Sequence, residues 1–245
     1  MKRMALIFVV IFNSFFIFSD DYKSLFDKAV GFYENKKYNE ALKIFLELKE
    51  YGFDNFNVNY NVGSTYFKLK KYGYSRYYFE RALFFKPFDK ELFNNLKIVY
   101  GKILKDEVYG EQEIMNKRII FFIPLKLLLI FFVVFFLASL VFLFLLLNSY
   151  KKSFLVLFIV AFFFSGIFTT LFLIQYFDYN RKIFVTSQNN VSVLIAPAKD
   201  ETAISILNEG SKGVIIEATK DFFKINLPDG TSGWIDKKKT VSNFF

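Results

Sequence analysis

The sequence predicts a multi-domain chain with three parts: an all-α helical repeat, a two-helix transmembrane hairpin and a small all-β barrel. Amphipathic helical patterns recur with a period of about 34 residues in the first part. Two long apolar runs follow them. Short β-branched and aromatic stretches, separated by turn residues, fill the end of the chain. The expected limits of the three parts are residues 20–110, 119–177 and 183–245.

The composition restricts the chemistry that this chain can perform. Hydrophobic residues make up 54% of the sequence and Phe occurs 37 times, whereas a soluble domain is about 45–50% apolar. The chain has no Cys and no His. This excludes disulfides, thiolate nucleophiles, Cys/His metal sites and an imidazole base. A Gly-x-Ser-x-Gly motif and a phosphate-binding loop are also missing from the sequence. We therefore expect neither an enzyme nor a cofactor.

The positive charge follows the apolar runs. The formal net charge is +9, but acidic and basic residues nearly balance within 20–113 and within 178–245. Surplus Lys and Arg beside apolar segments are typical of membrane proteins, whereas a nucleic-acid-binding face gathers them in one patch. The distribution therefore argues against a nucleic-acid partner and for a lipid bilayer. The surplus residues are Lys2, Arg3, Lys117, Arg118, Lys126, Lys151 and Lys152.

The N-terminal segment, residues 1–19, has the pattern of an export signal. Two basic residues precede the apolar run Met4–Phe18, and Ser19 and two Asp residues follow it. The run is about 15 residues long, which suits a signal peptide and is shorter than the roughly 20 residues that span a bilayer. An uncleaved N-terminal anchor is the alternative.

Two later runs are long enough to span a membrane, at 119–147 and 154–177. The short loop 148–153 between them requires an antiparallel hairpin. Pro124 marks the expected start of the first buried helix. Charge flanking does not decide the orientation, but an export signal places both soluble parts outside the bacterial cytoplasmic membrane. Small residues on the second run favour helix packing over transport: Ala161, Ser165 and Gly166.

The first soluble part consists of two helix pairs, 22–55 and 56–89, followed by a capping helix over 89–107. Two repeats cannot bury all of their apolar faces, so a cap is required. The second pair strongly resembles the tetratricopeptide (TPR) family, and the first pair matches it less fully. The residues that carry the resemblance in the second pair are Asn61, Val62, Gly63, Tyr66, Phe67, Tyr72, Phe79–Leu83 and Pro87.

The TPR resemblance implies a concave groove on the first helix of each pair. The groove lacks the Lys and Asn set with which related proteins hold a C-terminal carboxylate, so an apolar or aromatic peptide segment is the expected ligand. The alternative is that several of these side chains belong to the core. The candidate groove residues are Phe26, Val30, Tyr33, Tyr60, Ser64 and Phe67.

The last part, 183–245, is predicted to be an all-β barrel because short β-branched and aromatic stretches alternate with turns such as Pro228–Gly230. The pattern resembles bacterial SH3-like domains, most specifically at Gly233–Ile235. The resemblance implies a ligand surface that contains Phe222 and Trp234. A structural anchor is the alternative role for Trp234.

The order of parts resembles the BatE-type proteins of bacterial aerotolerance operons. That resemblance implies partners among membrane proteins with von Willebrand A domains and a MoxR-type AAA+ ATPase, and a role in oxygen or envelope stress. We therefore expect a non-enzymatic, membrane-anchored adaptor. The alternative is a peptidoglycan-associated anchor that acts mainly through the SH3-like domain.

Overall fold

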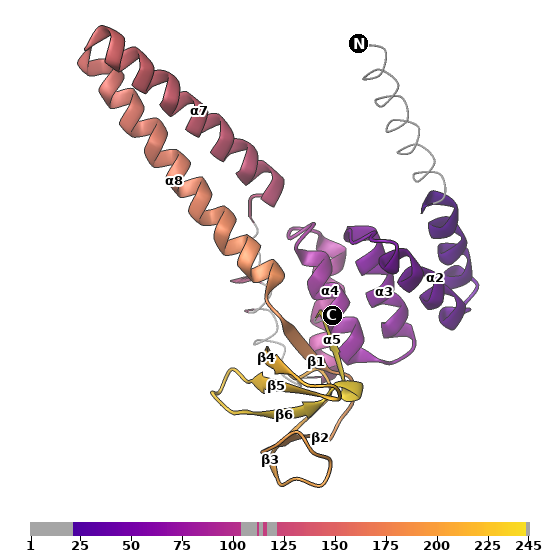
Figure 1. Ribbon diagram of the computed structural model, residues 1–245. Coiled ribbons are helices and arrows are strands. Elements are labelled where there is room, and N and C mark those ends of the chain that lie inside the picture. The colour runs from indigo at the N-terminus through magenta and orange to yellow at the C-terminus, as the bar shows by residue number, and fades with distance from the viewer. Residues whose placement is uncertain (1–21, 104–111, 113–114, 117–121, 244–245) are drawn as a thin grey trace, which may run out of the picture.

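The computed structural model describes residues 22–103, 112, 115–116 and 122–243. A helix over residues 22–34 comes first (Figure 1). The expected export signal, residues 1–19, and most of the linker before the apolar helices lie outside the described residues. The helices that follow are α2 (Tyr38–Glu50), α3 (Phe56–Lys68), α4 (Tyr72–Leu83), α5 (Lys90–Ile103), α7 (Leu125–Ser149) and α8 (Lys152–Asn180).

The helices up to α5 form TPR-like helical repeats. The helix over 22–34 packs on α2, and α3 packs on α4. Each pair turns through a lysine in the left-handed region, Lys36 with φ 60° and Lys70 with φ 59°. These two lysines are one repeat apart in the sequence, so the structure confirms the expected helical repeat.

The expected capping helix is α5, whose described part ends at Ile103. Asp89 caps its N-terminus, because its Oδ1 accepts a hydrogen bond from the Leu92 N–H at 2.9 Å. The apolar face of α5 joins α4 in one core, so the last repeat does not expose its hydrophobic side. The fully buried members of this core are Phe79, Ala82, Leu83, Leu92, Leu96, Val99 and Tyr100.

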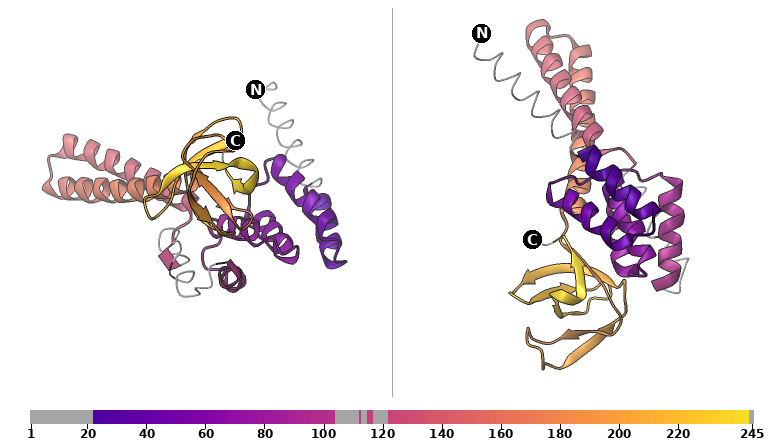
Figure 2. Two further views of the ribbon diagram at one scale, coloured as in Figure 1. Left: turned by 90° about the horizontal axis from the view of Figure 1, so that it is seen from below. Right: turned by 90° about the vertical axis from the view of Figure 1, so that its right-hand side faces the viewer.

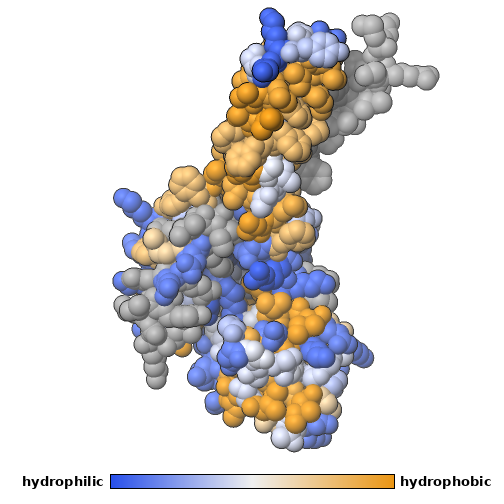
Figure 3. All heavy atoms as spheres, turned by 90° about the vertical axis from the view of Figure 1, so that its left-hand side faces the viewer, coloured by the Kyte–Doolittle hydropathy of each residue, from blue (hydrophilic) through white to orange (hydrophobic). Residues whose placement is uncertain are grey.

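Helices α7 and α8 form the expected antiparallel hairpin and pack along each other (Figure 2). Both are long and apolar enough to cross a membrane. Three small residues are buried between them: Ser139, Ala161 and Ser165. Hydrophobic side chains cover the outer surface of the hairpin (Figure 3). Pro124 is the N-cap of α7. The connection is shorter than 148–153, because only Tyr150 and Lys151 lie outside the two helices.

The C-terminal part is one antiparallel sheet with the order β3-β2-β6-β5-β4-β1-β7. Its inner face holds one core, which includes Phe184, Val193, Phe223 and Ile235. The last two strands in this order, β1 and the edge strand β7, lie against α4. The strands are β1 (Ile183–Thr186), β2 (Val191–Leu194), β3 (Ala203–Leu207), β4 (Lys212–Ala218), β5 (Phe222–Asn226), β6 (Ser232–Asp236) and β7 (Thr240–Ser242).

The expected closed barrel is not what the structure shows, because no ladder joins β3 to β7 in the described chain. Two strands that were not anticipated, β1 and β7, account for the difference. Val185 and Val241 of these strands enter the first core of the helical part. Since β1 and β7 are engaged with α4, the pairing ends at them and the sheet remains open.

Candidate functional site

A pocket of about 230 Å³ lies over the helical part. Four helices form it: the helix over 22–34 contributes Tyr33, α4 contributes Phe79, and α3 and α5 each contribute one face. The α3 residues Tyr60, Ser64 and Phe67 stand at helical spacing and share that face. Four of the six candidate groove residues therefore converge here. The remaining lining residues are Lys68, Phe79, Glu91, Asn95 and Ile98.

Tyr60 is held in place by residues of α5. Its hydroxyl donates to Glu91 Oε1 at 2.5 Å and accepts a hydrogen bond from Asn95 Nδ2 at 2.7 Å. Its ring packs 5.6 Å from the Phe79 ring, centroid to centroid. Burial, followed by the Glu91 carboxylate, raises the pKa of Tyr60 well above its usual range. The phenol therefore stays neutral at physiological pH, and its orientation is fixed before any ligand arrives.

Phe26 and Val30 do not line this pocket. Both pack against the first core of the helical part, and the Phe26 ring meets the Phe45 ring edge-on at 5.7 Å. These two residues therefore belong to the core, which was the alternative prediction for the groove residues. The α5 residues Glu91, Asn95 and Ile98 were missed because a capping helix was expected only to cover apolar surface. Their spacing of four and three residues places them on one helix face, which could have revealed them.

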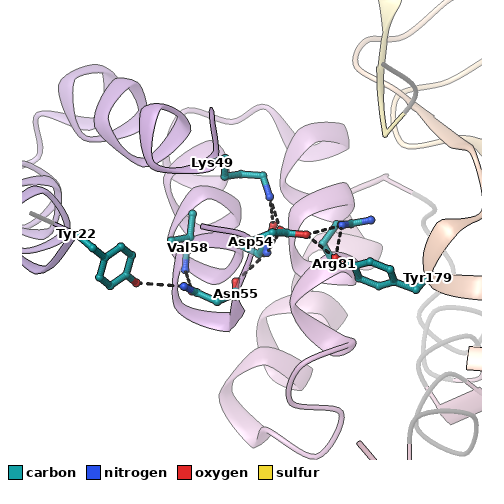
Figure 4. A network of polar contacts seen from close by, with 8 residues as sticks. Tyr22, Lys49, Asp54, Asn55, Val58, Arg81 and Tyr179 are labelled. Atoms are coloured by element: carbon teal, nitrogen blue, oxygen red, sulfur yellow. Dashed lines mark hydrogen bonds and ion pairs between the residues drawn. The ribbon is translucent and has the colours of Figure 1, made fainter. Parts of the chain in front are cut away.

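A second polar cluster joins the helical part to the base of the apolar hairpin formed by α7 and α8 (Figure 4). Asp54 lies at its centre, between α2 and α3. Its Oδ1 accepts hydrogen bonds from Lys49 at 2.6 Å and Asn59 at 2.7 Å. Its Oδ2 accepts from Arg81 at 2.6 Å and from the Tyr179 hydroxyl at 2.7 Å. Donors from four helices, α2, α3, α4 and α8, thus meet on one carboxylate.

The environment of Asp54 favours its charged form. Burial by itself would raise the pKa of this carboxyl group, but the Arg81 guanidinium and the hydrogen bonds from Lys49 and Asn59 outweigh burial and hold the pKa well below its usual range. Arg81 also stacks on the Tyr179 ring, with 4.6 Å from Cζ to the ring centroid. The cluster therefore links α4 to α8 through charge as well as through packing.

A third cluster joins the helical part to the sheet. Glu80 is 2% exposed and accepts hydrogen bonds from Arg76 Nε at 2.7 Å, from the Tyr100 hydroxyl at 2.9 Å and from Lys212 Nζ of β4 at 2.7 Å. Arg76 also donates to the Gly210 carbonyl at 2.6 Å. Nothing in the local sequence pattern pairs α4 with the sheet, so these contacts could not be anticipated.

The two candidate residues on the sheet lie in adjacent strands on its outer face. Phe222 of β5 is 6% exposed, so it offers little surface to a ligand. Trp234 of β6 is half-buried, and Lys224 Nζ lies 5.8 Å from its ring centroid. Trp234 and Lys224 are therefore the accessible part of this surface.

The described part of the chain contains no group of three or more acidic, His or Cys residues that could hold a metal ion. The clusters around Asp54 and Glu80 are saturated with donors from the protein itself. The arrangement suits recognition by a preformed surface, and the class of protein that the fold defines is a TPR-like helical repeat linked to two apolar helices and an antiparallel sheet.

No family model matches the chain, and no curated protein matches it. Among solved structures, the chain is similar to a structure titled "MamA R50E mutant", with 18% sequence identity and a TM-score of 0.34. That similarity covers 40% of this chain and 68% of the other chain.

Proposed function

We propose that this protein is a non-catalytic, membrane-anchored scaffold whose helical part binds a segment of a partner protein. The pocket formed by Tyr33, Tyr60, Ser64 and Phe67 carries this proposal. At about 230 Å³ it is smaller than the roughly 300–1,000 Å³ of small-molecule sites, so it suits one side chain of a peptide. Its lining mixes aromatic rings with polar and charged side chains, so an aromatic side chain suits it better than a purely apolar one.

Two features support anchoring in a membrane. Most large apolar side chains on α7 and α8 are exposed. Exposed apolar surface of this extent is unfavourable in water and favourable in a bilayer. The short connection also returns the chain to the same side, where the helical part and the sheet contact each other. We propose the bacterial cytoplasmic membrane, with both soluble parts outside it, because the N-terminal segment reads as an export signal.

The assignment to a particular complex depends on the resemblance in the order of the parts of the chain. We propose that the protein acts in an aerotolerance or envelope-stress complex of the BatE type, with von Willebrand A domain membrane proteins and a MoxR-type ATPase system as partners. On the same basis we propose that the C-terminal sheet is a divergent SH3-like module. Tethering to the bilayer raises the effective concentration of both modules toward partners in that membrane.

Photocrosslinking in intact cells tests the binding site. A photoreactive residue at Ser64 points into the pocket, while one at the exposed Lys43 on α2 serves as the control. We expect a discrete adduct from position 64 that is missing from position 43 and is lost when Tyr60→Ala is added. Equal adducts from both positions would show that the pocket has no specific ligand.

A second candidate function is association with peptidoglycan through the outer face of β5 and β6, favoured by the accessible Trp234 beside Lys224. The full chain in membrane vesicles should then sediment with purified sacculi, and Trp234→Ala should reduce the bound fraction. The full chain is needed, because Val185 and Val241 of the sheet are buried against the helical part. If the chain stays with the vesicles whether or not sacculi are present, the wall is not its ligand.

A further inference from the structure

An apolar pocket of about 410 Å³ lies where the membrane hairpin meets the helical part. Three separate segments form it: the end of α4, the first turn of α7 and the last turns of α8. It is distinct from the peptide pocket and shares no lining residue with it. The lining residues on which the argument depends are Phe84, Phe85, Leu125, Lys126, Gln175 and Tyr179.

The level of this pocket along the hairpin follows from helix geometry. Lys126 and Lys151 bracket α7, and no charged residue lies between them. At about 1.5 Å per residue the apolar segment is roughly 35 Å long, which matches an apolar slab of about 30 Å plus its interfaces. Lys126 therefore stands at the headgroup level on the side of the soluble parts, and the pocket beside it lies at the same level.

Aromatic side chains mark the same level. The Phe84 ring meets the Tyr179 ring edge-on at 5.0 Å. Nearby, Phe88 is 53% exposed and Phe122 is 68% exposed, and their rings contact each other at 5.7 Å. Tyr residues at the end of a spanning helix are typical of the bilayer interface, and Tyr179 holds this position in α8. The corner after α4 is thus built to rest in the headgroup region.

The pocket has a cation available at its rim. Lys126 is exposed, and no hydrogen bond or ion pair joins it to another residue in the described part of the chain. By contrast, the neighbouring Arg81 is engaged by Asp54, and Asp178 of α8 pairs with Arg181 at 3.8 Å. The pocket therefore combines apolar walls with an ammonium group that none of the described residues pairs with.

We propose that this pocket binds one anionic phospholipid from the leaflet on the side of the soluble parts. Lys126 contacts the headgroup phosphate, and the walls formed by Phe84, Phe85 and Leu125 hold the start of an acyl chain. The apolar surface of α7 and α8 continues from the pocket into the bilayer, so a lipid can enter without leaving the membrane. This inference depends on the membrane anchoring in the proposed function.

Native mass spectrometry of the full chain released from detergent tests the proposal, with phosphatidylglycerol and phosphatidylcholine as separate probes. We expect one retained phosphatidylglycerol with clear preference over phosphatidylcholine. Lys126→Gln should weaken phosphatidylglycerol binding about fivefold, since a basic residue near an anionic surface contributes on that scale. Lys220→Gln, in an exposed turn of the sheet, removes the same charge elsewhere and should have no effect.

Leu125→Trp provides a second variant that keeps the charge but fills the pocket, and it should reduce retention of both lipids. Equal phosphatidylglycerol retention in Lys126→Gln and Lys220→Gln, or no preference between the two lipids, would overturn the site. Either result leaves the membrane anchoring intact if the chain still fractionates with membranes. Recovery of the chain in the soluble fraction would instead remove the anchoring on which the site depends.

Discussion

At the scale of single residues, two carboxylates hold the parts of this molecule together. Asp54 binds donors from α2, α3, α4 and α8, and Glu80 binds donors from α4, α5 and β4. A buried carboxylate is costly unless its oxygens are satisfied by hydrogen bonds. Only Arg76 lies on the same helix as the carboxylate that it contacts. Since the other donors come from other segments, the cost of burial is offset in full only in the assembled fold.

The Asp54 cluster predicts an acid-sensitive stability. Because the pKa of Asp54 is lowered in the folded state, its stabilisation is complete above the pKa of an ordinary aspartate, about 3.9, and declines as the pH falls below that value. Asp54→Asn should lower the free energy of unfolding by about 1.5–3 kcal/mol at neutral pH. The difference from the wild type should shrink below about pH 4. Thermal unfolding of the full chain in detergent, followed across pH, measures this.

Asp27 supplies the matched control for that experiment. It is exposed on the helix over 22–34, so Asp27→Asn should leave the Tm unchanged at every pH. If Asp54→Asn keeps its full deficit at pH 3, the carboxylate charge is not the source of the stabilisation.

At the scale of helices, close packing depends on small residues at crossing points. A Cβ built on Gly63 of α3 would lie 2.6 Å from a carbon of the Phe79 ring, and Phe79 is 1% exposed. The ring cannot move aside in a packed core. Gly63 is one of the residues that carry the TPR resemblance, and the structure identifies Phe79 as the neighbour that requires a glycine there.

Gly63→Ala should therefore separate α3 from α4 and cost roughly 1–3 kcal/mol of stability. Gly31→Ala is the comparison, because a Cβ at this helical position would meet nothing within 4 Å. That substitution should stabilise the helix by about 0.5–1 kcal/mol. The Tm values of the two variants should move in opposite directions, and a shared direction would contradict the packing argument.

Gly73 likewise allows a close approach, in this case between the helical part and the sheet. A Cβ at Gly73 would collide with the Thr186 carbonyl oxygen of β1, and the Gly73 N–H donates to Glu209 Oε1 at 2.7 Å. We expect Gly73→Ala to loosen the sheet while the helical repeats stay folded. Limited proteolysis should then cut near β1 faster than in the wild type, and Glu209→Gln should show a weaker form of the same effect. Unchanged cleavage in both variants would contradict this interface.

The same elements show how far sequence reasoning reaches. The repeat period predicted the two helix pairs, and the length of the apolar runs predicted α7 and α8. Strands β1 and β7 were not predicted from the sequence, because each is short and is buried by α4, a helix distant in sequence. In the pocket, too, the residues grouped by local helix spacing were predictable and those brought in by long-range packing were not. Its α3 residues share one helix face and were predicted, whereas Glu91 and Asn95 join them only when α5 packs on α4.

At the scale of the whole molecule, the helical part and the sheet behave as one unit. Val185 and Val241 of the sheet share a core with Tyr77 and Tyr78 of α4, and Lys212 and Glu80 join the two parts by an ion pair at 2.7 Å. Helix α8 extends past its apolar run to place Tyr179 against Asp54. The unit is thereby held at a defined position against the end of the hairpin, rather than on a free linker.

This arrangement predicts that both soluble parts lie on one side of the membrane and the hairpin loop on the other. The chain has no native Cys, so single cysteines can be labelled without background. In intact spheroplasts an impermeant maleimide should label Lys43→Cys and Lys220→Cys, and should reach Ser153→Cys only after lysis. If the first two cysteines differ in accessibility, the shared core cannot exist in the membrane. If both require lysis, the hairpin is inverted while the contacts between the parts remain possible.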